Sequence, residues 1–354
     1  MKALYFGTYD RASPRNTQVV SCLRGAGVEV VELHREVWGR HNWSLGFGQL
    51  ARVLRAERNL AREAEHEADI VLVGYPGHFD MPAAKRVAHG RPIVFNPLVS
   101  LHDTLVGDRG RFRRHSPAAA VLRAADASAF RAADLVVADT EAQAAFFRTT
   151  FRLPAERVEV ALVGADEPLF RPGWQPPEPF RVLFVGKLIP LHGLETILAA
   201  ARLVPEVPFT VVGGGQLEKL LARRPPNVEH VSWLPYEELP NAYRTAGCAL
   251  GIFGEGQKAT RVIPNKVFQS LACACPVVTA DTRAARELLT DEADALLVPA
   301  GDPLALAAAV RRLAADEALA ARLGEAGRAT YEAHASEEVL GRRWRSLLAR
   351  VLAR

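Results

Sequence analysis

Cysteine and long apolar runs are scarce in this chain of 354 residues, and each scarcity excludes a class of protein. The four cysteines lie in apolar segments without a second Cys or His pair at zinc-like spacing, so we expect reduced thiols in or near the core. They are Cys22, Cys248, Cys273 and Cys275. No apolar run approaches the roughly 20 residues that cross a bilayer. The first predicted strand begins at Ala3, which favours a cytoplasmic protein without a signal peptide.

Two ligand-binding signatures are also missing. No two aspartates lie two positions apart, so the chain has no Asp-x-Asp pair to hold a divalent metal ion. The Gly-x-Gly-x-x-Gly turn of a dinucleotide-binding domain is absent too. The first strand is followed by Gly7 alone, and the glycines at residues 213–215 are followed by Glu218 where the last glycine would stand. A nicotinamide-dependent Rossmann oxidoreductase is therefore kept only as an alternative interpretation.

The composition is that of a globular enzyme, with 49% apolar and 24% charged residues and enough length for two domains. The net charge of +4 comes mostly from arginine, since the chain has only six lysines. Such a balance suits anionic ligands or an anionic membrane surface, and biased codon usage is the alternative explanation.

Apolar runs alternate with helical patterns through the first half of the chain, which predicts a mostly parallel sheet with helices on both faces. The runs cover residues 3–6, 28–33, 70–73, 93–95, 135–138 and 158–163. The proline-dense residues 167–179 cannot continue a helix or a strand and therefore mark a domain boundary. The alternation of strands and helices restarts after this boundary.

The most informative stretch is residues 261–279, where a helix is predicted to begin at Pro264 and a buried strand follows Cys275-Pro276. Asn265 and Lys266 fall in the first turn of that helix. A helix N-terminus offers unpaired N–H groups and partial positive charge, to which the lysine adds a full charge. Because a lysine there opposes the helix dipole unless an anion is bound, the pattern favours a phosphate or diphosphate.

A similar device precedes it. The apolar run at residues 182–185 is followed by Gly186-Lys187 and then by a predicted helix near Leu194. The next strand ends in the three glycines of residues 213–215, which let a ligand approach the backbone. Parallel α/β sheets bind phosphates at the carboxyl ends of their strands, where these turns are expected to lie.

In order and spacing, these pieces resemble the donor-binding half of glycosyltransferase family 4, whose members are retaining enzymes with the GT-B fold. The resemblance covers about residues 180–335. It is carried by Phe-Val-Gly-Lys (184–187), Pro-Leu-His-Gly (190–193), Val-Val-Gly-Gly-Gly (211–215), Trp-Leu-Pro-Tyr-Glu-Glu-Leu-Pro (233–240) and Ile-Pro-Asn-Lys-Val-Phe-Gln-Ser-Leu-Ala (263–272).

The resemblance implies an α/β protein with two Rossmann-like domains that face each other across a cleft. Residues 1–168 are expected to bind the acceptor, 169–179 to form a linker, and 180–335 to bind the nucleotide sugar. Residues 336–354 are expected to form a helix that packs back on the first domain, with Leu340, Trp344, Leu347, Leu348 and Val351 on one stripe.

Two positions depart from the family pattern. The family's Glu-x7-Glu pair falls on Arg261 and Gln269, and the lysine usually found before the helix glycine is His192. Gln269 is expected to keep the ribose contact through its amide oxygen, and Arg261 to favour a substrate with a negative group. The missing carboxylates also leave open a homologue that binds nucleotide sugars without catalysis.

The expected activity is metal-independent transfer of a sugar, with retention, from a UDP- or GDP-sugar to a hydroxyl acceptor. Lys187 and Lys266 are the predicted catalytic cations, because charge on the departing diphosphate grows as its bond to the sugar breaks. The alternative is a pair of solvated lysines at helix ends. The resemblance implies that the leaving phosphate itself accepts the acceptor's proton. It also places a histidine near the sugar, for which His102 is preferred.

The remaining donor-side candidates are turn glycines, polar residues of two loops and the start of the predicted helix. They are Gly186, His192, Gly214, Leu234, Pro235, Glu255, Arg261, Pro264, Asn265, Val267 and Gln269. Several of them keep open alternatives. Gly186 and Gly214 let backbone amides approach the donor or are plain turn glycines. His192 contacts the diphosphate or caps the next helix, and Glu255 and Arg261 contact the sugar or lie in an ordinary surface loop. Trp233 borders the base or belongs to the core.

In the first domain, Gly7, Arg15 and Asn16 border the first strand–helix turn, and the arginine is expected to face the cleft and an anionic group. His78 and His102 follow predicted strands and are expected to point into the cleft, His78 on the acceptor side and His102 near the sugar. The alternative for His102-Asp103 is a common hydrogen-bonding pair in a loop.

Two basic stretches bear on partners. Residues 109–115 place four arginines around one phenylalanine, which fits a peripheral contact with the inner face of a membrane, an anionic or lipid-linked acceptor, or a mobile basic loop. No recognition motif or aromatic platform accompanies these charges, so nucleic acid is not expected.

Overall fold

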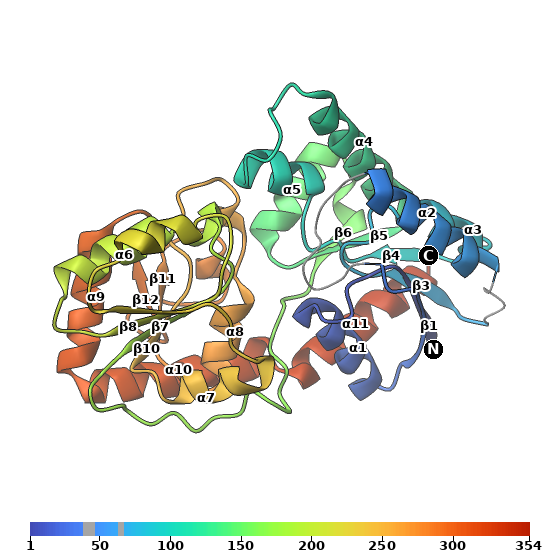
Figure 1. Ribbon diagram of the computed structural model, residues 1–354. Coiled ribbons are helices and arrows are strands. Elements are labelled where there is room, and N and C mark those ends of the chain that lie inside the picture. The colour runs from blue at the N-terminus through green and yellow to red at the C-terminus, as the bar shows by residue number, and fades with distance from the viewer. Residues whose placement is uncertain (38–46, 63–66) are drawn as a thin grey trace. The chain divides into compact units, whose positions relative to one another are not determined.

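The computed structural model describes residues 1–37, 47–62 and 67–354. The chain divides into two compact units, of which unit 1 comprises Met1–Val163 and Glu337–Arg354 and unit 2 comprises Gly164–Ser336. Each unit holds one six-stranded parallel sheet with helices on both faces (Figure 1). The α/β class expected from the alternating pattern is confirmed. The proline-rich residues 169–179 belong to unit 2.

The sheet of unit 1 has the strand order β2-β1-β3-β4-β5-β6. Its strands are β1 (Lys2–Gly7), β2 (Glu29–His34), β3 (Ile70–Val73), β4 (Ile93–Phe95), β5 (Leu135–Ala138) and β6 (Val158–Val160). All six follow predicted apolar runs, and β6 is shorter than its run. Helices cover both faces of a parallel sheet, so successive residues of its inner strands are buried and apolar. This is why such strands appear in the sequence as continuous apolar runs.

Successive residues of β1 serve two separate cores. Leu4 and Phe6 pack with one set of helices, and Ala3 and Tyr5 pack on the opposite face. The first set comprises α3 (Met81–Ala88), α4 (Pro117–Ala132) and α5 (Glu141–Phe151), and the opposite face is covered by α1 (Pro14–Gly25) and α11 (Glu337–Leu352). Unit 1 also contains α2 (Phe47–Arg62) and the short turns η1 (Asp103–Asp108) and η2 (Ala155–Arg157).

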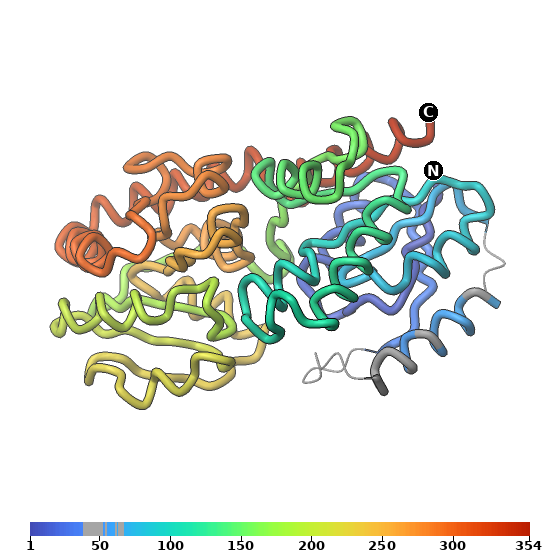
Figure 2. Tube along the Cα trace, turned by 90° about the horizontal axis from the view of Figure 1, so that it is seen from above, coloured from blue at the N-terminus to red at the C-terminus, as the bar shows by residue number. Residues whose placement is uncertain are grey.

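The C-terminal helix α11, drawn in red, lies in unit 1 and packs along α1 (Figures 1 and 2). The stripe predicted from its sequence is buried, with Trp344 only 1% exposed. Gly341 permits the close packing, because a Cβ there would lie 2.7 Å from the Cys22 carbonyl oxygen. The helix therefore closes one face of the sheet with residues far from the others in sequence.

The sheet of unit 2 has the strand order β12-β11-β10-β7-β8-β9. Its strands are β7 (Val182–Val185), β8 (Phe209–Val212), β9 (Val228–Val231), β10 (Cys248–Leu250), β11 (Val277–Ala280) and β12 (Leu296–Val298). Beyond the end of β10, Gly251 N still donates to the Val278 carbonyl oxygen of β11 at 2.8 Å, whereas Phe253 N donates to the His192 carbonyl oxygen at 3.2 Å.

In unit 2, α6 packs on α9 and α8 packs on α10 (Figure 1). The helices are α6 (Leu194–Leu203), α7 (Leu239–Arg244), α8 (Asn265–Ala272), α9 (Pro303–Ala315) and α10 (Glu317–His334). Short 3₁₀ turns connect them: η3 (Pro190–His192), η4 (Glu218–Arg223), η5 (Tyr236–Glu238), η6 (Ala259–Arg261) and η7 (Ala285–Glu287).

Helix α8 differs slightly from its prediction. Pro264 is the N-cap with extended backbone, so the helix begins at Asn265, and it ends at Ala272, before Cys275-Pro276. The four cysteines are buried and free, as expected. Within the described ranges, no helix is both long enough and apolar enough to span a bilayer.

Candidate functional site

The side chain of Lys266, in the first turn of α8, points into unit 2 rather than into solvent. The residue is 6% exposed, and Nζ lies 4.2 Å from the centroid of the Phe184 ring on β7. Nζ has no hydrogen-bond partner among the described residues. Burial lowers the pKa of this ammonium group well below its ordinary value. A buried cation without a partner is unfavourable until a negative group joins it, so the position indicates an anion site.

Gly186, the first residue after β7, lies directly against that ammonium group. A Cβ at this position would lie 2.7 Å from Lys266 Nζ and 3.1 Å from His192 Cε1. Its φ of +154° is also a value that residues with a side chain rarely adopt. Glycine therefore keeps the backbone open beside both basic side chains.

His192 ends η3 and is 9% exposed. Its Nδ1 donates to the Lys187 carbonyl oxygen, and its ring meets Phe184 edge to face, with 5.7 Å between centroids. Helix α6 begins after Gly193, which as a glycine supplies no side-chain cap. Lys187 itself is exposed on the same turn. One exposed and one buried lysine thus belong to neighbouring segments around Gly186.

The glycine turn after β8 is packed against the same backbone, because a Cβ on Gly213 would overlap the Gly186 carbonyl oxygen. Gly215 N donates to Glu218 Oε2 at 3.3 Å, and a Cβ on Gly214 would lie 3.0 Å from that oxygen. The Glu218 carboxylate therefore already accepts the hydrogen bond of the Gly215 N–H group, which an anion could otherwise use. An anion at this edge of the sheet is favoured beside Lys266 rather than at Gly215.

Gln269 lies one turn further along α8 and is 5% exposed. Its Oε1 accepts from the Tyr243 hydroxyl at 3.2 Å, and its side chain also hydrogen-bonds Tyr236. Burial and the nearby Asp166 raise the pKa of Tyr236 to about 12. The amide oxygen expected to contact a ribose is thus already bonded to Tyr243.

The other donor-side candidates separate by exposure. Leu234, Pro235, Arg261, Pro264 and Asn265 are half-exposed and Glu255 is exposed, so their side chains are available at the surface of unit 2. Val267 is a correction: it is 1% exposed, and its N–H donates to the Pro264 carbonyl oxygen at 2.9 Å. Both its side chain and its amide are used inside the unit, because its position on α8 faces the sheet.

Two of the loop residues discussed above, Trp233 and Glu255, are exposed in unit 2. Trp233 is 68% exposed, so the interpretation that it belongs to the core is wrong. Glu255 lies against Gly301, where a Cβ would come 2.5 Å from the Glu255 Cδ. A bulky residue at 301 would therefore displace the carboxylate expected near the sugar.

In unit 1, Gly7 has a packing role. Its φ is +126°, and a Cβ there would overlap the Asp80 carboxylate. Asp80 accepts hydrogen bonds from Thr8 N and Thr8 Oγ1, both at 2.8 Å. Burial raises the pKa of Asp80 to about 6. Glycine at position 7 admits this carboxylate to the end of β1.

Arg15 and Asn16, expected to border the cleft, are both 1% exposed and lie among residues of unit 1. The arginine donates to Asn96 Oδ1 at 3.1 Å and to the Leu162 carbonyl oxygen at 2.7 Å, and its guanidinium lies 5.6 Å from the Trp344 ring centroid. The arginine therefore lies on the face of α1 that meets α11 rather than on its outer face.

His78 and His102 have different surroundings. His78 is 4% exposed, and its Nε2 lies 3.4 Å from Asp126 Oδ1, so it is a buried structural partner rather than an open acceptor-side residue. Burial lowers its pKa. His102 is half-exposed, with Nε2 3.4 Å from Arg123 Nη2, while its backbone N–H donates to Asp126 at 2.9 Å. Burial and Arg123 lower the pKa of His102.

Two residues that shape these sites were not predicted from the sequence. Phe184 reads as an ordinary strand residue, yet its ring contacts both Lys266 and His192. Asp126 reads as a polar residue of an exposed helix, yet it orders the segment that carries His102. Apolar periodicity gives no signal for either contact. No group of three or more His, Cys, Asp or Glu side chains is arranged to hold a metal ion in residues 1–37, 47–62 and 67–354.

Two family models match consecutive parts of the chain. Residues 7–164 match a glycosyl transferase 4-like domain, and residues 179–316 match the glycosyl transferases of group 1. Similar curated proteins include the lipopolysaccharide core biosynthesis glycosyltransferase LpsD of Rhizobium meliloti, which is 27% identical over 51% of this chain and 52% of its own length. Phosphatidyl-myo-inositol mannosyltransferase of Mycobacterium leprae is 34% identical over 41% of this chain and 40% of its own length. The chain thus matches about half the length of these relatives or less.

The solved structures extend the similarity in fold over the whole chain. Sucrose-phosphate synthase from Thermosynechococcus elongatus has a TM-score of 0.78 with 18% identity and covers 99% of both chains. Anabaena HepE in complex with UDP-glucose has a TM-score of 0.72 with 17% identity and covers 99% of this chain and 100% of its own. These neighbours share two parallel sheets of the GT-B kind.

Proposed function

Because the chain belongs to the group 1 glycosyl transferases, we propose that it moves a sugar from a nucleoside diphosphate sugar to a hydroxyl-bearing acceptor. The donor is a UDP- or GDP-sugar, and the transfer proceeds with retention and without a metal ion. The observation that carries the proposal is Lys266, a buried cation without a hydrogen-bond partner, lying against the open backbone of Gly186. Membership in this family replaces the alternative of a nicotinamide-dependent oxidoreductase.

The chemistry assigned to Lys266 is stabilisation of the leaving diphosphate. As the bond between the anomeric carbon and the phosphate oxygen breaks, its electron pair stays on that oxygen, and the nearby ammonium group lowers the energy of the charge. Lys187 adds a second cation from the exposed side of the turn. The departing phosphate accepts the acceptor's proton on the same face of the sugar. The protein therefore does not need to supply a nucleophilic carboxylate. His102 of unit 1 contacts the sugar in this proposal.

Burial makes the Lys266 charge responsive to its ligand. In the unliganded protein the low pKa favours a neutral amine, and a diphosphate beside it favours the ammonium form. Metal ions serve this purpose in other transferases, whereas here a protein cation carries it. Arg261, where the family has a carboxylate, gives the donor loop a further positive charge and favours a substrate with a negative group.

The second candidate function is binding of a nucleotide sugar without transfer. It is favoured by the hydrogen bond that the Tyr243 hydroxyl donates to Gln269 Oε1. This amide oxygen is the one expected to take the place of the family's glutamate toward the ribose.

One experiment separates the two functions. The protein is incubated in EDTA with UDP-, GDP- and ADP-sugars, and both calorimetric binding and slow release of free sugar are followed. We expect one donor to bind and to be hydrolysed in EDTA. Binding without any hydrolysis supports the second function, and binding that needs magnesium or manganese contradicts the metal-free proposal. No binding of any nucleotide rejects both.

A peripheral membrane location is proposed for unit 1. Arg111, Arg113, Arg114 and His115 are exposed, and Val121 on the following helix is 62% exposed beside them in sequence. Exposed cations of this kind suit the anionic inner face of a membrane and a lipid-linked acceptor. Co-sedimentation with phosphatidylglycerol vesicles, lost in Arg113→Glu/Arg114→Glu and absent with phosphatidylcholine, tests it.

A further inference from the structure

A hollow of about 590 Å³ lies on unit 1, between α1 and the edge strand β2. Its wall is built by the loop after β1, by the outer side of α1, by Glu32 of β2 and by Glu337, the first residue of α11. The volume is that of a small-molecule site. No donor-side residue of unit 2 contributes to it, so the hollow belongs to different elements from the anion site.

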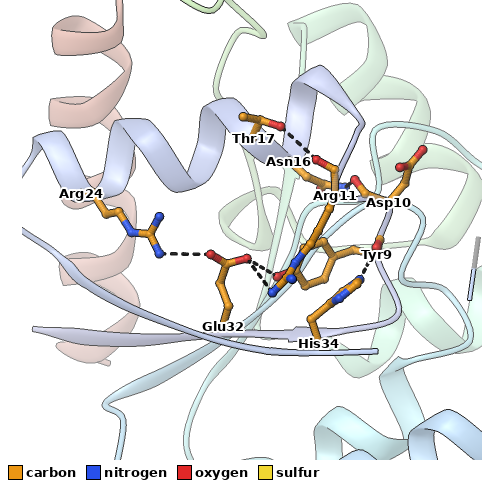
Figure 3. Close-up of polar contacts among 8 residues, drawn as sticks. All are labelled: Tyr9, Asp10, Arg11, Asn16, Thr17, Arg24, Glu32 and His34. Carbon is orange, nitrogen blue, oxygen red and sulfur yellow. Dashed lines mark hydrogen bonds and ion pairs between the residues drawn. The ribbon is translucent and has the colours of Figure 1, made fainter. Parts of the chain in front are cut away.

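Glu32 organises the polar groups of this hollow (Figure 3). Its Oε2 accepts from the Tyr9 hydroxyl at 2.6 Å and lies 3.5 Å from Arg11 Nη2, and its Oε1 accepts from Arg24 Nη2 at 3.0 Å. Burial alone would raise the pKa of Glu32, but Tyr9 and the two arginines outweigh it and lower the pKa. The carboxylate therefore stays ionised and holds two guanidinium groups at one place.

Those guanidinium groups keep most of their donors for a ligand. The side chains of Arg11 and Arg24 are 58% and 55% exposed, and each uses one nitrogen toward Glu32. A guanidinium carries five N–H donors in a planar fork, so several remain directed away from the carboxylate. Ser21 adds a hydroxyl group, whose proton goes to Glu337 Oε1 and whose oxygen can accept.

The charges around the hollow do not select an anion. Arg11 and Arg24 are balanced by Glu32 and Glu337, and Glu36 adds a further negative charge near Arg11. The lining does not suit an apolar ligand either, since Val20 is the single aliphatic side chain among the described residues that line it. The hollow therefore presents guanidinium donors, carboxylates and hydroxyl groups close together, without net positive charge.

Neutral molecules with many adjacent hydroxyl groups match this set, because each hydroxyl both donates and accepts and neighbouring hydroxyls can share one guanidinium or carboxylate. We propose that the hollow between α1 and β2 binds a neutral saccharide, in which Arg11 and Arg24 hold adjacent hydroxyl groups. The inference rests on the proposed sugar transfer, for which it names a neutral saccharide as the chemical class held by unit 1.

The test is saturation-transfer NMR on the full chain with methyl glycosides of glucose, galactose, mannose and N-acetylglucosamine. Arg24→Met and Arg11→Met each remove a guanidinium and keep the aliphatic stem. The matched control is Arg342→Met, since Arg342 is an exposed arginine of α11 that pairs with Glu338 outside the hollow. Thermal unfolding verifies that the variants fold, and Thr17→Trp fills the hollow from an exposed position of α1 without removing an ion pair.

We expect at least one glycoside to bind the unmodified chain at millimolar concentration. Binding should weaken about fivefold or more in Arg11→Met, Arg24→Met and Thr17→Trp and stay unchanged in Arg342→Met, the scale expected for losing hydrogen bonds to a charged group. The inference is overturned if no glycoside binds, if the three variants bind like the control, or if glucose 6-phosphate and inorganic phosphate bind while the glycosides do not. Glycoside binding in a protein that binds no nucleotide would keep this site and reject the proposed transfer.

Discussion

Lys266 Nζ lies 4.2 Å from the centroid of the Phe184 ring, and a Cβ on Gly186 would lie only 2.7 Å from the same nitrogen. The aromatic face partly compensates the charge when the amine is protonated. No hydrogen-bond acceptor from the described residues completes the compensation. The lysine is thus held in place without a hydrogen-bonding partner among the described residues, as expected of a group that pairs with an anionic ligand.

Gly186→Ala should weaken nucleotide binding by about tenfold or more, because the new methyl group meets the ammonium of Lys266 and the backbone φ of +154° becomes strained. Calorimetric titration with UDP and GDP measures the effect. The control is Gly256→Ala, since Gly256 lies in the same unit with open space around its Cβ position. Equal affinities of the two variants would contradict the assigned role of Gly186.

Lys266→Met should raise the free energy of unfolding by about 1 kcal/mol, since it replaces an uncompensated buried cation with an apolar side chain of similar length. The gain should depend on pH. In the unfolded chain lysine keeps its proton up to about pH 10.4, while the folded chain releases it at lower pH. Between the folded and the unfolded pKa of Lys266, the unfolded state binds more protons than the folded state. The free energy of unfolding of the wild type therefore rises with pH in that range.

Denaturant unfolding of wild type and Lys266→Met at a series of pH values checks this. The advantage of the variant should be largest below the folded pKa and should shrink as pH approaches 10.4. A difference that is constant over the whole range would show that Lys266 titrates normally in the folded protein.

Loss of either lysine should lower turnover by about 100-fold, the usual scale for one preorganised charge contact in a transition state. Lys187→Ala should leave stability unchanged, because that residue is exposed. Lys266→Ala should also abolish the proton uptake that accompanies nucleotide binding, measured by calorimetry in buffers of different ionisation enthalpy. Near-normal turnover in both variants would remove the two lysines from the site.

Gln269→Glu should be tolerated, because the Tyr243 hydroxyl can donate to a carboxylate as it does to the amide oxygen. Arg261→Glu should instead change the preferred donor or acceptor, since it reverses a charge in the donor loop. Initial rates with a panel of nucleotide sugars measure both. If Arg261→Glu keeps the preferences and kinetics of the wild type, Arg261 lies outside the sugar pocket.

Glu32→Gln should lower the melting temperature of the protein at neutral pH and have little effect in acid. The folded pKa of this carboxyl is lowered, so its stabilisation is complete above the unfolded value of about 4.3 and is lost as pH falls through the folded pKa. Circular dichroism melts from neutral to acidic pH measure the gap between wild type and variant. Glu338→Gln, which removes a carboxylate paired on an exposed helix face, is the control and should change little at any pH.

The order of strands and helices could be read from the sequence, because strands buried on both faces leave continuous apolar runs. Val182–Val185 and Ile93–Phe95 were located this way within a residue. The start of α8 could also be read, since a proline and a lysine at a helix N-terminus have a local physical meaning.

The surroundings of individual side chains could not be read in this way. Lys266 and Arg15 both follow a proline at a helix start, and from the sequence both side chains are expected to face an anionic ligand. In the structure Lys266 has no hydrogen-bond partner beside Gly186, whereas Arg15 is bonded to Asn96 and lies over Trp344. Helical periodicity determined which face each residue is on, but the partner across that face comes from a segment far along the chain. Only the packing of those segments decided which cation is left for a ligand and which one holds the fold together.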